Sequence, residues 1–156
     1  MRTAYLLAFV LTPLVACDSG SGELGRGEFE AAVSGDIDVM FSGTAEYSRD
    51  DVGTLPVIVL DLSEGGLSRQ RSFTLTGVDQ DFRSGVEHPL DATSVGLQLT
   101  YLDRSDGVGL FTSRSGSVTI KRMDGDRIIG SFVATLQDFL TGDTIEAEGS
   151  FDAERE

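Results

Sequence analysis

The stretch GSVTIKRMDGDRIIGSFVATLQ, residues 116–137, decides the fold. Apolar residues alternate with polar ones on both sides of Asp124 and Gly125, and a period of two places the apolar side chains on one face of a strand. Asp-Gly between two such runs is a strong signal for a two-residue hairpin turn. The stretch therefore predicts two antiparallel strands, over 116–123 and 126–137, joined at Asp124-Gly125.

The same period of two continues on both sides of this hairpin. Phe29, Ala31 and Val33 alternate with less apolar residues, and no window offers ten residues of clean helical period, so we expect at most a short helix. Eight or nine strands with turns at this spacing predict an all-β domain over 28–156, either an antiparallel sandwich or a small barrel. The further strands are expected at 28–34, 36–47, 55–62, 71–77, 94–101 and 144–153.

A short motif, Gly-x-Phe-x-Ala, occurs three times in the predicted strands. The period of two places all members of each copy on one face, where a glycine lets the aromatic ring of a neighbouring strand lie over bare backbone. The favoured interpretation is a packing device; the alternative is a lining of Phe29, Phe132 and Phe151 for an apolar ligand. The copies begin at Gly27, Gly130 and Gly149.

The N-terminal segment has the form of an export signal. Arg2 is followed by an uncharged run that reaches Cys17, too short to span a membrane as a helix. LVAC at 14–17 resembles the lipobox of bacterial lipoproteins, in which the cysteine is lipidated and becomes the first residue of the mature chain. The resemblance implies a signal peptide over 1–16, lipidation of Cys17, and a flexible Gly/Ser-rich tether over 17–27.

Lipidation of Cys17 implies a location in the bacterial cell envelope, facing the periplasm or the cell exterior. The acyl chains would then anchor the protein to a membrane, while the choice between inner and outer membrane stays open. Cys17 is the only cysteine in the chain, so we expect no internal disulfide.

The charge balance excludes one class of partner. The chain holds 26 acidic and 12 basic residues, for a formal net charge of −14. A surface of this sign repels nucleic acid and favours cations and basic partners.

Residues able to carry chemistry are few. His88 is the only histidine and precedes Pro89 in a stretch that reads as a polar connection. No Gly-x-Ser-x-Gly nucleophile elbow occurs, and the glycines at 20, 22 and 25 lack the strand and helix of a dinucleotide fingerprint. We expect no enzymatic activity and no cofactor.

Carboxylates two residues apart form a candidate calcium site. Glu28 with Glu30, and Glu146 with Glu148, share the face opposite the apolar residues of their strands. If these strands are neighbours, their like charges destabilise the sheet, and Ca²⁺, which prefers oxygen ligands, could relieve the repulsion. The alternative is plain surface solvation.

Two functions remain open for the domain. The last third of the chain, ending in GSFDAERE, resembles small bacterial lipoprotein domains of unknown function, which implies an all-β fold and no activity. The first function is a non-catalytic interaction domain that binds an envelope protein through loops 63–71 and 103–109, where Arg69, Arg71 and Arg104 stand out. The second is a barrel that carries a small apolar or lipid ligand, which requires free space between the phenylalanines.

Overall fold

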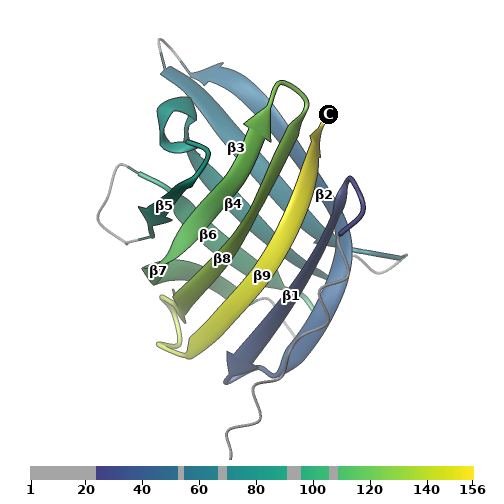
Figure 1. The fold of residues 1–156 in the computed structure, drawn as a ribbon. Coiled ribbons are helices and arrows are strands. Elements are labelled where there is room, and N and C mark those ends of the chain that lie inside the picture. Colours follow the sequence, from purple (N-terminus) through teal and green to yellow (C-terminus); the bar gives the residue numbers. More distant parts are fainter. Residues whose placement is uncertain (1–23, 53–54, 67–69, 91–95, 106–108) are drawn as a thin grey trace, which may run out of the picture.

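The computed structural model describes residues 24–156 except 53–54, 67–69, 91–95 and 106–108, and these residues form nine strands and one short 3-10 helix (Figure 1). The predicted all-β class is confirmed. The elements are β1 (Glu28–Gly35), β2 (Val39–Val52), β3 (Leu55–Glu64), β4 (Arg71–Val78), η1 (Asp79–Asp81), β5 (Val86–Pro89), β6 (Gln98–Asp103), β7 (Gly109–Asp124), β8 (Arg127–Asp138) and β9 (Thr144–Arg155).

Eight of these strands close into an antiparallel barrel. The strands β1, β2, β3, β4, β6, β7, β8 and β9 each pair with the next, and β9 pairs in turn with the whole length of β1. β5 is an extra strand on β7. Of the two architectures that the sequence left open, the structure is therefore the small barrel.

β7 is 16 residues long and contains two bulges, which bend it. The register with β8 skips one residue at Arg114 and another at Lys121. A bulge inserts an extra residue and bends the strand. β7 consequently pairs with β6 over its first residues and with β5 nearer its end.

The repeated Gly-x-Phe-x-Ala motif packs as the favoured interpretation requires. In the register of β8 with β9, Gly130 lies opposite Phe151 and Phe132 lies opposite Gly149. A Cβ atom on Gly149 would come within 2.6 Å of Phe132 Cζ, and one on Gly130 within 2.6 Å of Phe151 Cζ. Each ring therefore occupies the space that a side chain on the opposite residue would need.

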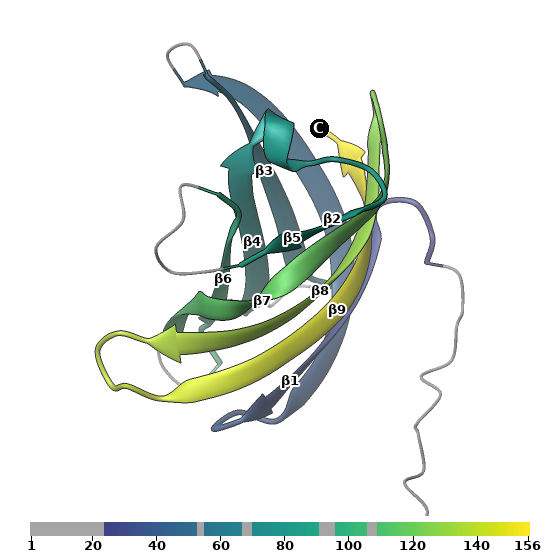
Figure 2. The same ribbon diagram turned by 60° about the vertical axis from the view of Figure 1, so that its left-hand side comes forward.

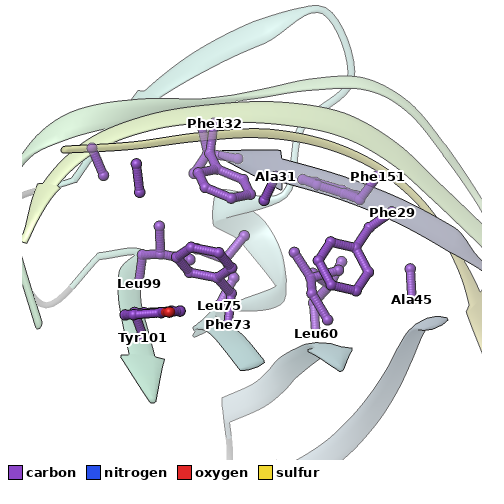
Figure 3. Close-up of a cluster of buried hydrophobic side chains, with 14 of the residues drawn as sticks. Phe29, Ala31, Ala45, Leu60, Phe73, Leu75, Leu99, Tyr101, Phe132 and Phe151 are labelled. Atoms are coloured by element: carbon purple, nitrogen blue, oxygen red, sulfur yellow. The ribbon is translucent and has the colours of Figure 1, made fainter. Parts of the chain in front are cut away.

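Aromatic rings form a buried cluster inside the barrel (Figure 3). Phe73 on β4 lies between Tyr101 of β6 and Phe132 of β8, with ring centroids 4.8 Å and 5.0 Å away. Phe41 stacks on Phe73 at 5.7 Å and meets Phe29 edge to face at 5.6 Å. Because β4 and β8 lie on different sides of the closed sheet, this cluster joins its walls.

Two local predictions were wrong. The strand β5, which holds His88, was expected to be a connection; its four residues are too few to show a period of two. The hairpin between β7 and β8 turns at Gly125-Asp126 rather than Asp124-Gly125, since Asp124 still pairs with Arg127.

The two ends of the barrel differ (Figure 2). We call the end that holds Leu24, the β7–β8 turn and the C-terminus the terminal end: Gly27 N donates to Asp152 O at 2.7 Å, and Arg26 contacts Asp126 and Glu154. The opposite end, with the β3–β4, β6–β7 and β8–β9 connections, is the loop end. β8 runs from one end to the other over 12 residues, which is about 36 Å along the strand. With the usual tilt of barrel strands, the ends are about 28 Å apart.

Candidate functional site

The three phenylalanines expected to line a ligand cavity all face the barrel interior and are buried. Phe132 contacts Phe73 and lies over Gly149, Phe151 lies over Gly130, and Phe29 packs against Phe41. Their neighbours are therefore other core side chains of this chain.

The four glutamates of the candidate calcium site lie on neighbouring strands, which is the condition that the site required, but in a staggered register. Glu30 pairs with Ser150 and Glu148 with Ala32, so these carboxylates are diagonal neighbours. Glu146 accepts a hydrogen bond from Thr135, and Glu28 accepts one from Gly25 N. Among the described residues, no group of three or more acidic, histidine or cysteine side chains is placed to hold a metal ion.

The described parts of the two loops expected to bind a partner lie side by side at the loop end of the barrel. Arg104 N donates to Gln70 O at 2.9 Å. Arg71 does not stand free: its guanidinium contacts Asp103 and Glu64, each at 3.2 Å. Arg104 is exposed, and Arg69 lies outside the described residues.

Asp103 is the buried centre of this polar cluster. It accepts hydrogen bonds from the Tyr101 hydroxyl at 3.0 Å and from the Ser105 hydroxyl and backbone N–H at 2.6 and 2.8 Å. Burial alone would raise the pKa of Asp103, but the bonds from Ser105 and Tyr101 and the charge of Arg71 outweigh it and lower the pKa. Burial, followed by the bond to Asp103, raises the pKa of Tyr101. The cluster therefore joins the ends of β3, β4 and β6 through their side chains.

An apolar hairpin tip projects from the loop end. Phe139 and Leu140, between β8 and β9, are 63% and 95% exposed. Leu110 on β7 is also exposed. It precedes Phe111, which pairs with Asp138, the residue before Phe139. Arg114, at the first bulge of β7, lies over the Phe139 ring at 4.5 Å. We call Leu110, Arg114, Phe139 and Leu140 the hairpin patch.

A groove of about 570 Å³ crosses the outer face of β2, β1, β9 and β8. Each wall is a row of four outward-facing residues, one from each strand, that pair with one another across the sheet. The row between the walls points its side chains inward, so its backbone forms the floor of the groove. The first wall is Met40, Ala32, Glu148 and Val133; the second is Ser42, Glu30, Ser150 and Ser131.

A second hollow, of about 440 Å³, opens at the terminal end beside Tyr47 and Phe82. Its charged groups include Arg49, paired with Asp79 at 2.7 Å. The Tyr47 hydroxyl donates to Gly125 O at 3.1 Å and so fastens the β7–β8 turn. His88 lies elsewhere, half-buried on β5, with Nε2 3.4 Å from Arg83 O.

Neither the hairpin patch nor the apolar residues Met40 and Val133 in the first wall of the groove were predicted from the sequence. Both leave a signal in the sequence: Phe139 and Leu140 are apolar within a turn, and Met40 and Val133 are apolar at positions that the alternation assigns to solvent. Exposed apolar residues that gather in one place mark interaction surfaces.

Comparison with known proteins finds no family model, no curated protein and no solved structure that matches this chain. No helix within the described part of the chain is long and apolar enough to cross a membrane. Cys17 and the expected signal peptide lie outside the described residues.

Proposed function

We propose that this chain is a lipid-anchored lipoprotein of the bacterial cell envelope whose barrel is a non-catalytic interaction domain. The observation that carries the proposal is the hairpin patch: Phe139 and Leu140 are exposed at the end of the barrel opposite to the end that the N-terminal segment joins. Solvent exposure of adjacent large apolar side chains costs free energy unless a partner covers them.

The position of Leu24 supports the orientation of the domain on a membrane. Only seven residue steps separate Leu24 from Cys17, a chain that reaches at most about 25 Å. A lipidated Cys17 would therefore keep the terminal end within about 25 Å of the bilayer, whereas the hairpin patch lies at the far end of the barrel.

The buried polar groups support a structural role. Each has a partner within the described chain: Asp152 pairs with Arg127, Ser113 accepts from Leu99 N, and Asp138 accepts from Leu140 N. A catalytic carboxylate instead needs an open cleft and a substrate position beside it.

The alternative of an apolar-ligand carrier has less support. Phe73 and Phe132 meet inside the barrel at 5.0 Å, where a carrier needs space for its cargo. Native mass spectrometry of the full chain, purified gently from bacterial cells, tests it: we expect a mass without bound lipid beyond the covalent anchor, and a stoichiometric additional lipid would favour the carrier.

Two experiments test the proposed function. We expect Cys17→Ser to move the protein from the membrane fraction to the soluble fraction of bacterial cells, and an unchanged membrane fraction would contradict the anchor. With a photo-crosslinking amino acid at position 140, we expect a discrete adduct in living cells. The same amino acid at Glu87, an exposed position on β5, is the matched control. No adduct at 140, or the same adduct at both positions, would contradict the interaction role.

A further inference from the structure

The groove on the outer face of β2, β1, β9 and β8 carries both exposed apolar side chains and carboxylates. Met40 and Val133, which are 83% and 58% exposed, stand at the two ends of its first wall. Ala32 and Glu148 lie between them, and the second wall carries Glu30 among serines. The two rows contain two carboxylates and no basic side chain.

Glu30 and Glu148 face each other diagonally across the middle of the groove. The register pairs Glu30 with Ser150, two residues from Glu148 on the same strand. Diagonal neighbours of this kind are about 7 Å apart, a separation that one guanidinium can bridge with its several N–H donors. None of the ion pairs formed by the described residues involves Glu30 or Glu148.

The dimensions of the groove fit a short extended peptide. The walls are two residues apart along each strand, which gives about 7 Å, and four strands give a length of about 14 Å. An extended segment of about five residues spans that length. Its central side chain would reach the two carboxylates. The side chains two residues away on either side, which point to the same face of the segment, would reach Met40 and Val133.

We infer that this groove binds a segment of a partner protein in which an arginine stands between apolar residues. The arginine lies between Glu30 and Glu148, and the apolar neighbours cover Met40 and Val133. The carboxylates disfavour anionic lipid and nucleic acid at the same place. The inference rests on the proposed interaction function and adds a site and a partner chemistry to it.

The test uses the purified full chain and two fluorescent pentapeptide pools. Both pools carry random Leu, Val, Ile or Met on either side of one central residue, which is arginine in one pool and citrulline, its uncharged analogue, in the other. By fluorescence anisotropy, we expect the arginine pool to bind at least tenfold more tightly, and less tightly as NaCl is added. Amide shifts in NMR spectra should map to residues 30–32, 40–42, 131–133 and 148–150.

Matched variants locate the binding. Glu30→Gln with Glu148→Gln should abolish the preference for arginine, and Met40→Ser should weaken binding of both pools severalfold. Glu87→Gln with Asp143→Asn, which removes the same charge from exposed positions elsewhere, should leave binding unchanged. These side chains are exposed, so all variants should keep the native melting temperature.

Three outcomes would overturn the inference. The first is equal binding of both pools, and the second is an equal loss of binding in the control variant. The third is a doubled mass in light scattering that the Glu30/Glu148 variant abolishes. That result would assign the groove to a second copy of this chain. None of them alters cross-linking at position 140, and failure of that cross-linking leaves the peptide result standing. The two proposals can therefore fail separately.

Discussion

The ring of Phe132 on β8 lies directly over the backbone of Gly149 on β9. A Cβ atom at position 149 would come within 2.6 Å of Phe132 Cζ and 2.9 Å of the backbone oxygen of Glu30. We therefore expect Gly149→Ala to lower the free energy of unfolding by about 1–3 kcal/mol, the usual cost of overpacking a core. Urea denaturation measures this change.

Gly125→Ala is the control for this substitution. Gly125 has no atom within 4 Å of its Cβ position, so alanine should change stability by no more than about 0.5 kcal/mol. Equal stability of the two variants would show that the ring does not rest on Gly149.

The contact between Phe73 and Phe132 predicts an energetic coupling across the barrel. Each single change to leucine should destabilise the fold, and the double variant should lose less than the sum, with a coupling of about 0.5–1.5 kcal/mol. Thermal or urea unfolding of the four proteins completes the cycle. Strict additivity would indicate that the rings do not touch and would reopen the carrier alternative.

Asp103 predicts a specific loss of stability in acid. Its pKa in the folded protein lies below the ordinary value, which in an unfolded chain is about 3.9. The ionised group therefore contributes stability that is complete above about pH 5 and is lost as the pH falls through the folded-state pKa. Asp103→Asn should cost about 2 kcal/mol at pH 7 and should flatten the decline in stability below about pH 5.

Asp143→Asn provides the comparison for Asp103, because Asp143 is an exposed carboxylate near the same end of the barrel. Urea denaturation at several pH values should show the native decline in this variant. If the stability of the Asp103→Asn variant declined with falling pH as steeply as that of the native chain, Asp103 would not contribute to the loss of stability in acid.

Calcium is expected to have no effect on stability. Glu28 lies opposite Asp152, which is paired with Arg127, and Glu30 and Glu148 are offset by two residues. The like charges are thus separated or neutralised without an ion. Millimolar calcium added after chelation should leave the melting temperature unchanged, and a rise of several degrees would establish a site at these glutamates.

Much of the fold could be predicted from the sequence because alternation reports which face of a strand is buried. Phe29, Phe132 and Phe151 were expected on one face of their strands, and all three are in the core. The closure of the barrel could not be predicted in this way. It depends on β1 meeting β9, a pairing between strands far apart in the sequence that alternation does not record.

The candidate surfaces were harder to predict because they are assembled from several strands. Met40 and Val133 become the two ends of one wall only through the register of four strands. Arg71 was expected to stand out in a loop that binds a partner, since the sequence does not show that Asp103 and Glu64 reach it. The bulge that holds Arg114 against Phe139 likewise has no simple sequence signature.

Pairing of β1 with β9 also places the beginning of the barrel beside its end, with Gly27 N bonded to Asp152 O. Such a chain suits circular permutation. A short linker from Glu156 to Leu24 and new ends at Gly65 and Gly66, in the β3–β4 connection, would preserve every strand pairing while moving the attachment point to the loop end. In the proposed lipoprotein, the same barrel would then stand inverted on its lipid anchor. The position of the attachment point, and not the fold, would decide which surface this domain offers to its surroundings.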